Sequence, residues 1–234
     1  MGTGLEVQAA VEDSTVRRTF CDLSEDQIHD AEESLLLRHP LFGKRLHWED
    51  ILQSRLILLV SEAQSGKSYE CHARQEALWA EGRPAFLIEL AAVAMQPWAE
   101  LRSPEETERL DAWRRSSDIA TIFLDSVDEL KLTQGNFRAA LRNVANDLAG
   151  QMSRVRVVLT SRPLPIDRAL FIKTFAAPTM TSALTEDEFA SLAMGDKKSS
   201  VTDNAVPDIR IVALLPLSQR DVATIAADRG VTNT

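Results

Sequence analysis

Residues 55–68 read RLILLVSEAQSGKS and decide the expected fold of this 234-residue chain. Residues 56–60 form an unbroken apolar run rich in branched side chains, which predicts a strand buried on both faces. Small and polar residues follow, then the tripeptide GKS at 66–68, and residues 69–80 have the pattern of a helix. Strand, loop, Gly-Lys-Ser and helix is the layout of a phosphate-binding loop.

The chemistry of phosphate binding explains these residue types. Backbone N–H groups of the loop and of the helix N-terminus point at phosphate oxygens. Lys67 supplies a positive charge to the terminal phosphates, and the Ser68 hydroxyl is a hard oxygen ligand for Mg²⁺. The predicted nucleotide contacts are Ser61, Gln64, Ser65, Gly66, Lys67, Ser68 and Tyr69.

The loop departs from the usual pattern G-x-x-x-x-G-K-[ST] at its first position, where Ser61 replaces glycine. Serine is small, so the turn can survive, but Gly66 is the only glycine left in the loop. By composition, a Gly-Lys-Ser/Thr tripeptide arises by chance in about one chain in ten of this length. An ordinary helix N-terminus with a surface lysine is therefore the alternative interpretation, and further support must come from elsewhere in the chain.

A second informative stretch, IATIFLDSVDEL, covers residues 119–130. It predicts a strand over 119–125 that ends in an acidic residue, and in doubly wound sheets ligands gather at the carboxyl ends of the strands. Asp125 is the expected Mg²⁺ ligand, directly or through water. Asp128 or Glu129 would then orient or activate the attacking water. A strand that ends in a solvated acidic turn is the alternative.

Hydrophobic periodicity and capping signals predict the remaining elements. The expected strands cover residues 85–90, 155–160 and 209–215. The expected helices cover residues 41–51, 104–115, 137–148, 185–193 and 219–229, besides one that Ser24 caps and Pro40 ends. Residues 1–20 and 164–208 have the least regular pattern, and residues 196–208 read as a polar loop. These elements divide the chain into an N-terminal helical segment, 1–50, and an α/β core, 51–234.

Two side chains allow two interpretations each. Arg162 follows the strand predicted at 155–160, where it could sense the terminal phosphate of a nucleotide; otherwise it is a surface residue before Pro163. Trp48 could cover a bound base, because it comes shortly before the phosphate loop, but large aromatic side chains mostly serve packing. Anchoring of the N-terminal segment to the core is therefore the favoured role of Trp48.

Composition and charge narrow the class of protein. The formal net charge of −9 disfavours a nonspecific nucleic-acid binder, which would carry a basic field. The two cysteines, Cys21 and Cys71, fit a reducing compartment and predict no disulfide framework. The N-terminus has no signal-peptide pattern, and no apolar run approaches the ~20 residues that span a bilayer. The expectation is a cytoplasmic protein without membrane or direct nucleic-acid partners.

Four landmarks together resemble the NACHT clade of the signal-transduction ATPases with numerous domains, the STAND class of P-loop NTPases. They are the Lys67 loop, DSVDE at 125–129, LTSRP at 159–163 and LLPL at 214–217. The family's acidic motif is an Asp, a small residue, an apolar residue and two acids, and residues 125–129 match it position by position. The resemblance covers roughly residues 45–230.

The resemblance implies a fold and a set of roles. The fold would be a three-layer α/β/α sandwich with a mainly parallel five-stranded sheet, in which the Thr160 strand lies between the phosphate-loop strand and the acidic strand. ATP or ADP with Mg²⁺ would be the ligand. The implied roles are phosphate and metal binding by Lys67 and Ser68, metal binding by Asp125, activation of water by Asp128 or Glu129, and phosphate sensing by Arg162.

Such proteins look like switches: ADP holds a closed monomer, and ATP with a trigger gives an oligomer that activates an effector. The expected function is a slowly hydrolysing, ATP-binding switch in signalling or defence that forms a homo-oligomer and acts with effector or sensor regions outside this chain. The family's winged-helix and sensor regions have no room here, so the expectation is a fragment or a truncated member. A degenerate, non-hydrolysing P-loop scaffold is the main alternative. A motor-type ATPase is disfavoured by the absence of a basic patch.

Overall fold

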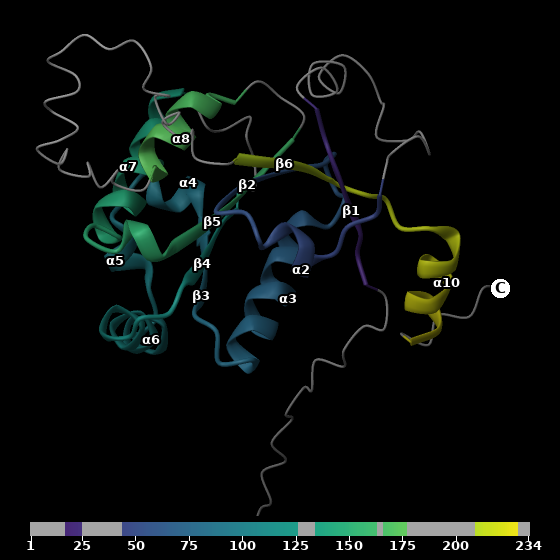
Figure 1. Cartoon of the computed structure of the whole chain (residues 1–234), viewed down its shortest axis with the longest axis horizontal. Coiled ribbons are helices and arrows are strands. Elements are labelled where there is room, and N and C mark those ends of the chain that lie inside the picture. Colours follow the sequence, from purple (N-terminus) through teal and green to yellow (C-terminus); the bar gives the residue numbers. More distant parts are fainter. Residues whose placement is uncertain (1–16, 25–43, 126–133, 163–165, 177–208, 229–234) are drawn as a thin grey trace, which may run out of the picture.

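The computed structural model describes residues 17–24, 44–125, 134–162, 166–176 and 209–228. These residues form an α/β fold around one mixed sheet of six strands in the order β1-β6-β2-β5-β4-β3 (Figure 1). Only β1 runs antiparallel to its neighbour, and the other neighbouring strands are parallel. The strands are β1 Phe20–Asp22, β2 Leu56–Val60, β3 Ala85–Glu89, β4 Ala120–Asp125, β5 Val155–Ser161 and β6 Ile209–Leu214.

The helices lie between these strands in the sequence, except α10, which follows β6. They are α2 Trp48–Ile51, α3 Lys67–Ala80, α4 Leu90–Val93, α5 Trp98–Leu101, α6 Pro104–Arg115, α7 Gln134–Asp147, α8 Arg168–Phe175 and α10 Gln219–Asp228, with a 3₁₀ turn η3 at Met152–Arg154. Within the described part of the chain, no helix has the length and apolar character to cross a membrane.

The strand order confirms one expectation and corrects another. As expected, β5 pairs with both β2 and β4, so the Thr160 strand separates the strand before residues 61–68 from the strand that ends in Asp125. The expected count of five strands is wrong, because β1 adds a sixth. Its pairing with β6 places Phe20 opposite Leu214, which lies near the other end of the sequence. Three residues are too short for a periodic signal, and no local pattern predicts so distant a partner.

Some element boundaries and short helices also differ from prediction. Helix α3 begins at Lys67, two residues earlier than expected, and β3 ends at Glu89 because α4 starts at the next residue. Helix α8 lies in a region that was expected to be irregular, and of the helix predicted at 41–51 the described residues show only α2. The helix capped by Ser24, the helix at 185–193 and the loop at 196–208 lie outside the described residues.

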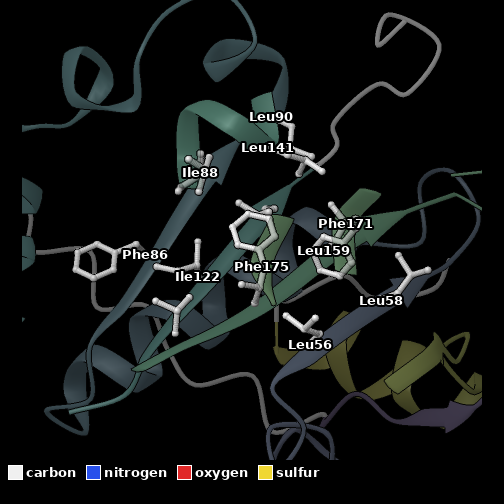
Figure 2. Packing of buried hydrophobic residues seen from close by; sticks show 14 of the residues in the cluster. Leu56, Leu58, Phe86, Ile88, Leu90, Ile122, Leu141, Leu159, Phe171 and Phe175 are labelled. Atoms are coloured by element: carbon white, nitrogen blue, oxygen red, sulfur yellow. The ribbon is translucent and has the colours of Figure 1, made fainter. Parts of the chain in front are cut away.

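Both faces of the sheet are buried, as the apolar run of β2 predicted. Alternate residues of β2 enter different clusters, Leu56 and Leu58 on one face and Ile57 and Leu59 on the other. Figure 2 shows the first cluster, where α7 and α8 cover the sheet; its labelled members are Leu56, Leu58, Phe86, Ile88, Leu90, Ile122, Leu141, Leu159, Phe171 and Phe175. The second cluster takes its helical members from α2 and α3, among them Trp48, Ile51, Cys71 and Leu78.

Helix α6 begins at the predicted capping box. Ser103 Oγ accepts a hydrogen bond from the Glu106 N–H at 3.1 Å, and the Glu106 carboxylate accepts one from the Ser103 N–H at 2.9 Å. We expect Ser103→Ala to lower the free energy of unfolding by about 1 kcal/mol, because a backbone donor loses its partner. Urea denaturation would measure this loss. Glu108→Ala on an exposed site of the same helix is the control, with a change within about 0.5 kcal/mol; equal losses in both variants would contradict the cap's contribution.

Candidate functional site

The loop that joins β2 to α3 lies at the carboxyl end of a central strand of the sheet. Two of its residues have positive φ angles, Gln64 at 61° and Gly66 at 90°. Gly66 is the N-cap of α3, and its left-handed conformation turns the chain directly into the helix. Glycine adopts this conformation without steric cost, which explains why the remaining glycine of the motif stands here.

Lys67 is the first residue of α3, and its side chain turns back into the loop. Its Nζ donates hydrogen bonds to the backbone oxygens of Ser61 at 2.9 Å and Glu62 at 3.0 Å. The residue is only 9% exposed. The interpretation of Lys67 as a surface lysine is therefore wrong. A buried lysine at the start of a helix is one of the parts that a phosphate-binding loop uses.

Ser61 fits the position where the usual motif has glycine. It is 1% exposed, and its N–H donates to the Ser161 oxygen of β5 at 3.0 Å. Its hydroxyl lies 2.8 Å from the Ser65 hydroxyl, so the two serines share a hydrogen bond inside the loop. Among the described non-glycine residues, only Gln64 has a positive φ. Ser61 therefore has a backbone conformation that any residue can adopt, and the turn does not require glycine there.

Asp125 ends β4 at the same edge of the sheet. It is 4% exposed, and its Oδ1 accepts a hydrogen bond from Thr160 Oγ1 of β5 at 2.8 Å. Because β5 lies between β2 and β4, the polar residues at the ends of these three strands form one row next to the loop. The alternative of a solvated acidic turn is wrong for Asp125, because its carboxylate is buried and oriented by Thr160.

The buried thiol of Cys71 interacts electrostatically with charged side chains of α3 and β4. Burial raises the pKa of Cys71 well above its usual range, and the carboxylates of Asp125 and Glu70 raise it further, whereas Lys67 lowers it. Cys71 lies one turn after Lys67 in α3 and is fully buried. The thiol therefore stays protonated and packs in the second apolar cluster.

The other predicted residues occupy different positions. Ser68 and Tyr69 lie in the first turn of α3 and are exposed, Tyr69 at 59%. Gln64 is exposed at the tip of the loop, and Arg162 is half-buried directly after β5. Asp128 and Glu129 lie outside the described residues. The structure thus brings together the loop, Asp125 and Arg162 at one edge of the sheet.

Trp48 has the packing role that the sequence favoured. Its ring makes edge contacts with Phe20 and Phe123, with centroids 4.8 and 5.8 Å apart. It is buried, and its Nε1 donates to Glu70 Oε1 at 2.7 Å. The interpretation of Trp48 as a cover for a base is therefore wrong. Glu70 and Arg18 are polar residues near the loop that sequence reasoning missed, because their partners are remote in the chain.

The partly buried carboxylate of Glu70 predicts a pH dependence of the stability of the fold. Burial raises its pKa, while the hydrogen bond from Trp48 and the charges of Arg18 and Arg74 lower it. A raised pKa in the folded state means that stability is lost as pH rises from the ordinary carboxyl range through the folded pKa. We expect Glu70→Gln, which keeps an acceptor for Trp48, to gain stability relative to wild type as pH rises.

Thermal melts between pH 4 and pH 7.5 would measure this difference. Glu108→Gln on the exposed face of α6 is the control, and its melting temperature should follow that of wild type at every pH. A constant offset between Glu70→Gln and wild type across the range would contradict the assignment.

Comparisons with known proteins give little. No protein-family model matches the sequence, and no curated protein matches it significantly. Among solved structures, the solution structure of protein NMB1076 from Neisseria meningitidis is similar at 20% sequence identity and a TM-score of 0.30, covering 59% of this chain and 87% of that chain. A likeness at this TM-score carries no argument about fold or function.

Proposed function

We propose that this chain is a P-loop NTPase of the NACHT type, whose three-layer α/β/α core binds ATP or ADP with Mg²⁺. The observation that carries the proposal is the position of Lys67, whose Nζ is held inside the loop by two backbone oxygens 2.9 and 3.0 Å away. A buried carboxylate, Asp125, ends β4 in the same sheet, with one strand between it and the strand that leads into the loop. A cation and a carboxylate at one edge are the two charges that a metal–nucleotide complex requires.

The loop has the chemistry to hold phosphate groups. Backbone N–H groups of the loop and of the first turn of α3 would donate to phosphate oxygens, and Lys67 would exchange its bonds to loop carbonyls for bonds to phosphate. Ser65, Gly66 and Ser68 supply further donors along the same turn.

The donor set also fits Mg²⁺, which prefers hard oxygen ligands. Ser68 would offer its hydroxyl, and Asp125 would offer its carboxylate, which Thr160 orients through a hydrogen bond of 2.8 Å. When bound, the ion would neutralise part of the negative charge of the phosphates.

Hydrolysis would need residues beyond Ser68 and Asp125. Asp128 or Glu129 would orient the attacking water, and Arg162 would contact the terminal phosphate from the end of β5. Slow hydrolysis of this kind suits a switch. The bound nucleotide would control assembly into a homo-oligomer. The oligomer would signal to effector or sensor regions outside this chain. A role in signalling or defence is part of the same proposal.

A non-hydrolysing scaffold is the competing proposal, because Gly66 is the only glycine left in the loop. The nucleotide content of the purified chain separates the two. After denaturation, ion-exchange chromatography of the supernatant should detect stoichiometric ADP. A chain that is purified empty and retains no ADP after incubation with Mg-ADP and desalting would favour the scaffold.

A further inference from the structure

Arg18 joins two parts of the fold that are far apart in sequence. Its Nη1 donates a hydrogen bond to the Ser65 oxygen at 3.1 Å, and its Nη2 donates one to the Leu215 oxygen at 2.9 Å. Ser65 belongs to the phosphate loop, and Leu215 directly follows β6. The guanidinium group also lies against Gly66, because a Cβ built on that glycine would be 3.3 Å from Nη1.

Strand pairing fixes Arg18 at this place. β1 pairs with β6 through Phe20 and Leu214, and the Leu215 N–H donates to the Thr19 oxygen at 2.9 Å. β6 is also the neighbour of β2, whose end leads into the phosphate loop. The residue before Thr19 therefore lies beside both strand ends. A planar guanidinium fork can bind both carbonyls at once, whereas a lysine ammonium on its flexible stem is a single point of charge.

The same guanidinium interacts with carboxylates on two helices. Burial lowers the pKa of Arg18, and the charges of Glu70 on α3 and Asp221 on α10 oppose this shift. Asp221 also caps α10: its carboxylate accepts from the Ser218 N–H at 2.8 Å, and its own N–H donates to Ser218 Oγ at 3.1 Å. Arg18 thus contacts the loop and the end of β6, and lies in the electrostatic range of the first turn of α10.

We propose that Arg18 is a positioning residue that couples the phosphate loop to the end of β6 and to helix α10. The response of this coupling to nucleotide rests on the proposed function. The link between the loop and the helix does not depend on that function. Phosphate in the loop would change the surroundings of the Ser65 peptide, whose carbonyl oxygen accepts the hydrogen bond from Arg18. This change passes through Arg18 to Leu215 and to the cap of α10. Nucleotide binding therefore changes the local stability of α10, which follows the last strand of the sheet.

Amide hydrogen exchange on the full chain tests both parts of the proposal. Wild type, Arg18→Ala, Arg18→Lys and the control Arg17→Ala, which changes an exposed arginine one residue away, are compared without nucleotide and with Mg-ADP. Without nucleotide, Arg18→Ala should exchange faster in two segments together, residues 61–68 and α10, while β4 stays protected. Arg18→Lys should recover part of the protection, and Arg17→Ala should match wild type.

With Mg-ADP, wild type should show altered exchange in α10, and Arg18→Ala should lose this response and bind Mg-ADP about tenfold more weakly, as expected for a charged hydrogen bond. Faster exchange in only one of the two segments, or in neither, would overturn the coupling. An unchanged α10 response in Arg18→Ala would overturn it too. If wild type binds no Mg-ADP, the proposed function and the nucleotide response both fail. Hydrogen exchange measured without nucleotide then decides by itself whether Arg18 links the loop and the helix.

Discussion

Replacing Lys67 by alanine is expected to weaken Mg-ADP binding by about 100-fold or more, close to 2.7 kcal/mol. Charge-assisted hydrogen bonds to phosphate are among the strong ones, and the phosphates would meet them in a buried site. The lysine is 9% exposed and already oriented by the oxygens of Ser61 and Glu62, so little ordering is needed when the ligand arrives. Isothermal titration of the variant with Mg-ADP would measure the loss.

A loss of affinity assigns Lys67 to the binding site only if the Lys67→Ala variant still folds. Lys67→Ala removes a donor from two loop carbonyls, so a modest loss of stability is expected, and circular dichroism should still show a cooperative thermal transition. Lys173→Ala, an exposed lysine in the last turn of α8, is the matched control and should bind as wild type does. Binding by folded Lys67→Ala within about threefold of wild type would remove this residue from the site.

Asp125→Asn should abolish the benefit of Mg²⁺ for nucleotide binding. Asparagine keeps the shape of the side chain and an oxygen that can accept the hydrogen bond from Thr160 at 2.8 Å. It removes the negative charge that a divalent cation requires. Affinity for ADP in the presence of Mg²⁺ should fall roughly 10- to 100-fold, while affinity measured in EDTA should change little. Turnover of ATP, if wild type shows it, should be lost.

Comparing the ADP affinity in Mg²⁺ with the ADP affinity in EDTA makes this test specific for the metal. A variant that is merely less well packed would lose affinity equally with and without Mg²⁺. Asp118→Asn is the matched control, because Asp118 is exposed and precedes β4 at the opposite end of the strand. An Mg²⁺ benefit in Asp125→Asn equal to that of wild type would show that the metal is held elsewhere.

Local patterns predicted the parts of the fold that local physics determines. The apolar run of β2 indicated burial on both faces because its residues alternate between two apolar layers. The start of α6 followed from Ser103, Pro104 and Glu106, whose contacts all lie within one turn. The acidic end of β4 was predictable for the same reason, because the apolar residues before Asp125 mark where the strand must end.

Long-range contacts account for what the sequence did not predict. β1 depends on a partner strand at the far end of the chain, and Arg18 gains its role only when β1 brings it between Ser65 and Leu215. Ser61 left the loop geometry open, because the motif alone does not say whether glycine serves conformation or close packing. Its hydrogen bonds to Ser161 and Ser65 are features of the folded loop, and no spacing rule contains them.

Isothermal titration of the wild-type chain with Mg-ADP, after bound nucleotide has been removed, measures directly whether the chain binds nucleotide. We expect one saturable site per chain with a Kd of about 1 μM or tighter, and a clear loss of affinity when EDTA removes the metal. Absence of saturable binding up to about 1 mM Mg-ADP, with the chain still folded, would contradict nucleotide binding and leave the loop of residues 61–68 as a structural turn.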